Sequence, residues 1–171
     1  QRLCAFLHVP LLHRHRDVRL VGSGDQQRFR LVARAQLREE ELVASAAREL
    51  TRAPVIGIAE AAMKAATMLA TSFSVVTTLP RSVPVIEELA RRYGVDHQCR
   101  KVRSASIPVL ALEEEGSGAR EKVRDEILRA IREDNCEAIV LGCAGMADLT
   151  DWLSRETGVP VIDGVTVAVK F

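Results

Sequence analysis

A single cysteine near the C-terminal end of the chain is the residue best placed to do chemistry. It stands in the stretch EAIVLGCAGMADL (residues 137–149), where an apolar run ends at Gly142 and is followed by Cys143, Ala144 and Gly145. Small neighbours let a ligand approach the sulfur closely, and a helix that starts just beyond favours the thiolate over the thiol. Free cysteines are also common as small buried side chains. The residues alone therefore leave two interpretations, a core side chain or an acid–base or nucleophilic thiol.

Three further polar residues are predicted to follow strands. Thr77 and Thr78 end the β-branched run FSVVTTL (residues 73–79), and Glu60 comes just after the apolar run PVIGI (residues 54–58). Ligands of open parallel sheets bind outside the carboxyl ends of the strands. The hydroxyls and N–H groups of the threonines could therefore hold a carboxylate or an amide, and Glu60 could act as a catalytic base. The plainer interpretations are strand propensity for the threonines and a first-turn helix acid for the glutamate.

No motif for a cofactor or a metal ion is present. The sequence has neither GxGxxG nor GxxxxGK[ST], so nucleotide phosphates have no predicted site. The four cysteines form no CxxC pair and no cluster with histidine at metal-ligand spacing. Asp148 and Asp163 are not arranged with a serine and a histidine as a catalytic triad needs. We therefore expect no cofactor and no metal, and we interpret Cys99 and Cys136 as buried structural thiols.

From residue 54 onward, strand-like apolar runs alternate with helix-like segments. Strands are predicted at residues 54–58, 73–79, 97–105, 137–142 and 159–163, and helices at residues 59–70, 82–94, 118–135 and 148–158. The run at 97–105 alternates polar and apolar residues, which is typical of a strand near an edge. The alternation predicts an α/β fold, with a parallel sheet that carries helices on both faces.

The totals exclude several classes of protein. A chain of 171 residues can form one full core or two small lobes, and 47% hydrophobic and 27% charged residues are ordinary for a globular protein. A net charge of +1 argues against a nucleic-acid partner, and no apolar stretch is long enough to span a membrane. We find no signal peptide and expect a cytoplasmic protein with reduced cysteines, with a disulfide through Cys4 left open.

The composition changes near residue 53. Residues 1–52 contain no Lys, Ile, Asn, Met, Tyr or Trp, whereas arginine recurs throughout them. Three interpretations remain: a basic arm that contacts phosphates, a solvated or helical lead-in, and an out-of-frame translation of GC-rich DNA. We therefore divide the chain into an atypical N-terminal segment, residues 1–52, and an α/β lobe, residues 53–171.

Four stretches of the second part resemble one known family. PVIGIAEAAMKAA, FSVVTTLPRS, EAIVLGCAGMADL and GVPVIDGV are similar to the hydantoin and allantoin racemases of the aspartate/glutamate racemase superfamily, over about residues 46–169. The resemblance implies a cofactor-independent isomerase with two α/β lobes, each of which presents a thiol to the stereocentre of a small hydantoin-type substrate. One thiolate removes the proton next to a carbonyl, and the opposite thiol returns a proton to the other face.

The resemblance assigns roles to individual residues. Cys143 matches the second-lobe catalytic thiol, and the substrate-binding positions are Thr77, Thr78, Gly142, Ala144 and Gly145. Glu60 joins this set from its place after the run at 54–58, and we also expect a homo-oligomer.

The chain departs from the family pattern in its first part. The first-lobe thiol, in a Cys-x-Gly-Asp-Pro-like turn, would fall near Arg38, where AQLREEELVAS contains no cysteine, glycine or proline. The family's opening strand with its Asn-Pro-Asn turn is absent, and the family continues beyond Phe171 into a further helix. Two other functions stay open, a decarboxylase-like enzyme that uses one thiol and a non-catalytic α/β binding module.

Overall fold

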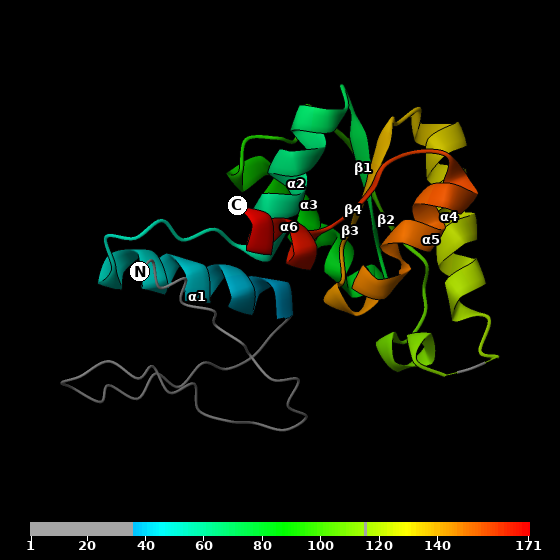
Figure 1. The fold of residues 1–171 in the computed structure, drawn as a ribbon, viewed down its shortest axis with the longest axis horizontal. Coiled ribbons are helices and arrows are strands. Elements are labelled where there is room, and N and C mark those ends of the chain that lie inside the picture. The colour runs from blue at the N-terminus through cyan, green and yellow to red at the C-terminus, as the bar shows by residue number, and fades with distance from the viewer. Residues whose placement is uncertain (1–35, 115) are drawn as a thin grey trace. The chain divides into compact units, whose positions relative to one another are not determined.

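A parallel sheet is the centre of the computed structural model, which describes residues 36–114 and 116–171 (Figure 1). Its strands are β1 (Phe73–Thr77), β2 (Cys99–Ser104), β3 (Ala138–Leu141) and β4 (Val161–Asp163), in the order β2-β1-β3-β4. Every neighbouring pair is parallel. The predicted α/β class is confirmed, and β2 lies at an edge of the sheet as its alternating pattern indicates.

Helices cover both faces of this sheet, as predicted. The α-helices are α1 (Gln36–Leu50), α2 (Ile58–Leu69), α3 (Val83–Arg92), α4 (Ala119–Asp134), α5 (Thr150–Thr157) and α6 (Gly164–Lys170). Short 3-10 helices are η1 (Pro80–Ser82), η2 (Val109–Leu112) and η3 (Ala144–Leu149). No helix in the described ranges is long and apolar enough to cross a membrane.

The strands divide the core into two apolar clusters because successive side chains point to opposite faces. On one face, Phe73 and Val75 of β1 pack with α2 and α3. On the other face, Val76 and Ile139 pack with α4 and α5. Figure 1 shows α2 and α3 on one side of the sheet and α4 and α5 on the other. All residues of β1, β3 and β4 are buried, which is the pattern of a sheet covered on both faces.

The strand predicted at residues 54–58 is wrong. Residues 54–57 form no ladder, and α2 begins at Ile58 with Ala61 donating to the Gly57 carbonyl (2.9 Å). A short apolar run can bury itself as a strand or as a helix start, and periodicity alone does not separate the two. Here Ile58 is held against Gly164, where an added Cβ would lie 2.5 Å from the Ile58 carbonyl oxygen. The start of α2 is therefore fixed by its contact with the start of α6.

Helices α6 and η2 are among the described elements that the sequence analysis did not predict. Helix α6 follows β4, and Asp163 caps it by accepting a hydrogen bond from the Thr166 N–H (2.7 Å). An aspartate before a short apolar run is an N-cap signal that could have indicated this helix. Helix η2 lies in the connection from β2 to α4. Predictions for residues 1–35, including Cys4, fall outside the described residues, and the division at residue 53 stays a prediction.

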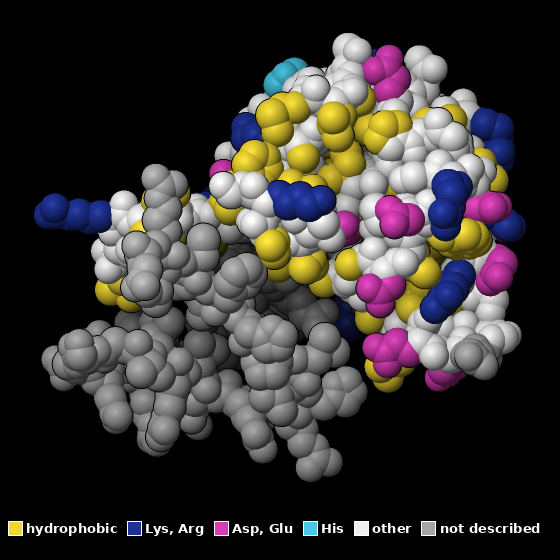
Figure 2. All heavy atoms as spheres, viewed as in Figure 1, with side chains coloured by type: hydrophobic (Ala, Val, Ile, Leu, Met, Phe, Trp, Pro, Cys, Tyr) yellow, Lys and Arg dark blue, Asp and Glu magenta, His cyan; other side chains and the backbone are white. Residues whose placement is uncertain are grey.

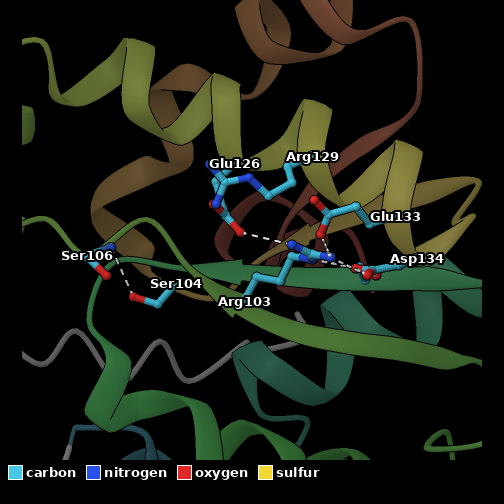
Figure 3. A network of polar contacts seen from close by, with 8 residues as sticks. Arg103, Ser104, Ser106, Glu126, Arg129, Glu133 and Asp134 are labelled. Atoms are coloured by element: carbon cyan, nitrogen blue, oxygen red, sulfur yellow. Dashed lines mark hydrogen bonds and ion pairs between the residues drawn. The ribbon is translucent and has the colours of Figure 1, made fainter.

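A buried arginine ties β2 to α4 (Figure 3). Arg103 is 7% exposed and donates through Nε to Asp134 (2.6 Å), with further ion pairs to Asp134 Oδ1, to Glu133 (2.7 Å) and to Glu126 (3.3 Å). The Ser74 hydroxyl donates to the same Asp134 carboxylate (3.0 Å). Burial alone raises the pKa of Asp134, but the hydrogen bonds from Arg103 and Ser74 outweigh burial and hold that pKa below its usual range.

We expect this pairing to make stability depend on pH in the acid range. Because the pKa of Asp134 is lower in the folded chain, its contribution is complete above the unfolded pKa of about 3.9 and is lost as pH falls through the folded pKa. In urea denaturation from pH 6 to pH 2, Asp134→Asn should lose less stability than wild type as the pH falls, because the carboxylate that titrates is absent. The exposed Asp96→Asn is the control, and equal slopes for Asp134→Asn and wild type would contradict the assignment.

Candidate functional site at the carboxyl edge of the sheet

Cys143 lies just past the carboxyl end of β3. The Gly142 N–H donates to the Val76 carbonyl (2.8 Å), which continues the strand ladder by one residue, and Cys143 is extended with φ −150°. Its carbonyl accepts from the Met146 N–H (3.1 Å) as η3 begins. The sequence predicts an α-helix from residue 148, but the segment after the thiol is the six-residue η3, and α5 starts at Thr150. The side chain of Cys143 is half-buried beside the cluster on the α4 and α5 face.

Gly142 is required here by space rather than by backbone conformation. A Cβ at this position would lie 3.0 Å from Ile86 Cδ1, 3.0 Å from Thr77 Cβ and 3.1 Å from Val75 Cγ1. These distances are shorter than ordinary contacts between carbon atoms. Any side chain at residue 142 would push β3 away from β1 and move the thiol that follows.

The two threonines differ in what their side chains do. The Thr77 hydroxyl is buried and donates to the Gly142 carbonyl (3.1 Å), so it holds the turn that leads to Cys143. The Thr78 carbonyl accepts from the Ile107 N–H (3.0 Å) and from the Ser104 hydroxyl (3.0 Å). Among the described residues, no group binds the Thr78 hydroxyl. Thr77 therefore positions the backbone, whereas the hydroxyl of Thr78, a buried residue that is 2% exposed, has no described partner.

Gly145 opens the space beside the sulfur. A Cβ at residue 145 would lie 3.8 Å from Cys143 Sγ, 3.3 Å from Val109 Cγ1 and 4.0 Å from Leu112 Cδ1. Both Gly145 and Ala144 are exposed. The sequence-predicted residues Thr77, Gly142, Cys143 and Gly145 are thus brought together, and the aliphatic side chains of η2 beside the thiol are an addition that only the structure shows.

Glu60 does not join this group in the described contacts. It lies in the first turn of α2, where its carboxylate pairs with Arg48 of α1 (2.6 Å), and Arg48 also donates to the Val55 carbonyl (3.0 Å). The expected strand before it does not exist, so its predicted position at a strand end was wrong. Its substrate-binding role remains a prediction without a contact to the thiol or to the threonines.

A shallow hollow of about 460 Å³ lies beside β4 and does not include the thiol. Asp148, Asp163, Thr166 and Lys170 contribute polar groups to it, and Asp163 is committed to capping α6. Cys143 precedes η3, whereas the hollow is lined by Ala147 and Asp148 in the later part of that helix. In residues 36–114 and 116–171, no group of three His, Cys, Asp or Glu side chains is placed to hold a metal ion.

The other described thiols are poorly suited to acid–base work. Burial, then the charges of Glu87 and Asp134, raise the pKa of Cys99 to about 12. Burial also raises the pKa of Cys136. Both residues lie near the amino ends of strands, Cys99 opening β2 and Cys136 preceding β3. They are therefore at the opposite edge of the sheet from Cys143.

These features place the chain among the parallel α/β proteins whose site lies at the carboxyl edge of the sheet. Residues 40–171 match the family model Asp/Glu/Hydantoin racemase. The chain belongs to the Asp/Glu/Hydantoin racemase family, which agrees with the resemblance seen in the sequence.

Individual relatives support this assignment. The hydantoin racemase of Rhizobium meliloti is 58% identical over 125 residues, which are 73% of this chain and 52% of that protein. The allantoin racemase from Klebsiella pneumoniae superposes with a TM-score of 0.71 at 55% identity, over 75% of this chain and 52% of that one. The allantoin racemase from Pseudomonas fluorescens also superposes with a TM-score of 0.71, at 45% identity, over 74% of this chain and 54% of that one. The chain thus spans about half the length of the relatives it matches.

We expect Cys143 to be the most readily alkylated of the three described cysteines. A thiol with a pKa of about 12 is ionised in roughly one molecule in ten thousand at pH 8, and Cys136 is buried. Iodoacetamide at pH 8, followed by peptide mass mapping, should therefore label Cys143 at least about ten times faster than Cys99 or Cys136. The Cys143→Ala variant controls for nonspecific labelling. Preferential labelling of Cys136 would show that the carboxyl edge is closed.

Proposed function

We propose that the chain carries one acid–base thiol, Cys143, of a cofactor-independent racemase that acts on hydantoin-type small molecules. The observation that carries the proposal is the half-buried thiol at the carboxyl end of β3, held by the Thr77–Gly142 hydrogen bond and opened by Gly145. The names of the relatives, hydantoin racemase and allantoin racemase, supply the substrate class. Residues 53–171 form the lobe that contributes this thiol.

The proposed step is a proton transfer at the ring carbon next to a carbonyl. The Cys143 thiolate takes the proton, the electron pair of the C–H bond moves toward the carbonyl carbon, and the carbonyl oxygen becomes an enolate. The reverse transfer from the thiol restores the C–H bond, so no redox partner is needed. Enolate charge is stabilised by hydrogen-bond donors fixed in place, and we assign the Thr78 hydroxyl to hold the substrate by such a bond.

One thiol cannot easily serve both faces of a held carbon. Inversion needs a base on one face and an acid on the other, whereas the described residues place a single half-buried thiol at this edge, with Cys99 and Cys136 at the opposite edge. We therefore propose that Cys143 exchanges the ring proton of one enantiomer with solvent and returns it to the same face. Inversion requires a second acid–base group from outside the described residues.

Hydrogen exchange in heavy water tests this proposal. Each enantiomer of a 5-substituted hydantoin is incubated with the chain, and deuterium at the ring carbon and optical rotation are followed together. We expect enzyme-dependent deuterium uptake by one enantiomer, with little inversion, after the spontaneous exchange has been subtracted. Cys143→Ala should reduce the enzyme-dependent rate at least about a hundredfold, because the proton acceptor is lost.

Three results would contradict the proposed proton exchange. Rapid inversion of both enantiomers would show a second acid–base group within this chain. Enzyme-dependent exchange that Cys143→Ala leaves unchanged would remove the thiol from the reaction. No exchange with either enantiomer would favour a non-catalytic α/β binding module. Cys136→Ala serves as the matched cysteine control, since its thiol is buried at the amino edge.

We also propose a homo-oligomer in the cytoplasm. The described cysteines are free thiols, which fits a reducing compartment. An apolar face formed by α2 and α6 supports self-association, and Figure 2 shows hydrophobic side chains gathered over these helices. Its exposed members are Met68 (67%), Leu69 (65%), Val169 (57%) and Phe171 (64%). Large exposed apolar patches are typical of interaction surfaces.

A charge placed on this face should dissociate the oligomer. Met68→Glu puts a carboxylate among apolar side chains, and its burial in an interface would be unfavourable without a partner. Sedimentation velocity at micromolar concentration should show wild type as an oligomer and Met68→Glu as a monomer. Leu42→Glu, at a similarly exposed residue of α1, should leave the oligomer intact. A monomeric wild type would contradict the proposal.

A further inference from the structure

The segment between β2 and α4 stands at the same edge of the sheet as the thiol. After β2 ends at Ser104, the Ala105 N–H donates to the Thr77 carbonyl (2.9 Å) and the Ile107 N–H donates to the Thr78 carbonyl (3.0 Å). These bonds carry the chain along β1 past its carboxyl end before η2 begins at Val109. Residues 105–112 therefore border the site rather than only connecting two elements.

The segment is held in a defined shape at its start. The Ser104 hydroxyl donates to the Thr78 carbonyl (3.0 Å) and accepts from the Ser106 N–H (3.0 Å), and Figure 3 shows these two serines side by side. Ser106 has φ 55°, in the left-handed region that non-glycine residues rarely adopt. This turn is stabilised by the same Ser104 side chain that binds the end of β1. The start of the segment is thus coupled to Thr78.

The end of the segment, around η2, is also held in shape by hydrogen bonds. The Ala111 N–H donates to the Pro108 carbonyl and the Glu113 N–H to the Leu110 carbonyl, both at 3.1 Å. The Ser117 hydroxyl donates to the Ala111 carbonyl. Helix η2 is therefore a turn held by its own hydrogen bonds.

Aliphatic side chains of η2 share the space beside the sulfur. The point where a Cβ of Gly145 would lie is 3.3 Å from Val109 Cγ1, 4.0 Å from Leu112 Cδ1 and 3.8 Å from Cys143 Sγ. Leu112 is buried and Val109 is half-buried, so the wall next to the thiol is apolar. A substituent on the carbon that loses its proton is one bond from the reacting centre. It must therefore lie within a few ångströms of the sulfur.

We propose that Val109 is a specificity-determining residue that selects hydantoins with an aliphatic or arylalkyl 5-substituent over allantoin, whose substituent is a polar ureido group. This inference rests on the proposed function and names the substrate class within it. Binding against an aliphatic wall becomes more favourable with each methylene group that it removes from water. The same wall offers no hydrogen-bond partner to the N–H and C=O groups of a ureido substituent, and burying these groups unpaired is unfavourable.

Val109→Thr tests the selection with almost no change in side-chain shape. Exchange rates in heavy water are measured for 5-isopropylhydantoin and for allantoin, and the ratio of the two rates is compared with that of wild type. We expect the ratio to fall at least about fivefold in Val109→Thr, since one apolar-to-polar change in a substrate pocket alters discrimination by about that much or more. Val159→Thr is the matched control, a half-buried valine before β4 at the opposite edge of the sheet, and its ratio should equal that of wild type.

The outcomes separate this inference from the function on which it rests. If wild type catalyses exchange and Val109→Thr leaves the ratio of the two exchange rates unchanged, the role of Val109 is overturned and the proposed function stands. Absence of any Cys143-dependent exchange would overturn both. Binding is checked independently by ¹³C-methyl NMR of labelled valine. The Val109 methyl signals should shift on titration with 5-isopropylhydantoin, whereas those of Val159 should not, and unshifted Val109 signals would also overturn the inference.

Discussion

The close approach of β1 and β3 around Gly142 is the constraint on which the site depends. Side-chain atoms of Val75, Thr77 and Ile86 leave no room for a Cβ at that position, and the Thr77 hydroxyl binds the Gly142 carbonyl (3.1 Å). The residue that follows has one path out of the sheet, and that path presents the thiol of Cys143 at the carboxyl edge. A side chain at position 142 would require Val75, Thr77 or Ile86 to shift by a few tenths of an ångström.

The carboxyl edge of the sheet and the face covered by α4 have different roles. At the carboxyl edge, hydrogen bonds from Thr77, Ser104 and Ile107 end on backbone carbonyls, and the thiol of Cys143 lies half-buried beside them. On the α4 face, the buried Arg103 is surrounded by carboxylates, among them Asp134, which also accepts from Ser74. Such a buried cluster is strongly destabilised when one partner is removed, by about 3–5 kcal/mol. It fixes β2 to α4, and β2 in turn positions the segment beside the thiol.

The chain belongs to the Asp/Glu/Hydantoin racemase family and spans only part of the length of its relatives. The chain matches about half the length of the hydantoin and allantoin racemases to which it is similar. Within the described residues, one thiol lies at the carboxyl edge, and the proposed function assigns it one face of the acid–base chemistry. The geometry therefore accounts for proton exchange more directly than for inversion, and the proposed function follows that distinction.

The sequence by itself determined the α/β class, the edge position of β2 and the place of Cys143 after a strand, because burial on both faces leaves continuous apolar runs and glycines mark the turn. Tertiary structure decided what local pattern could not. Residues 54–57 are not a strand because α2 starts against Gly164, and Glu60 pairs with Arg48 instead of facing the thiol. The nearness of Val109 to the sulfur depends on contacts between residues far apart in the chain, and such contacts leave no periodic signal in the sequence.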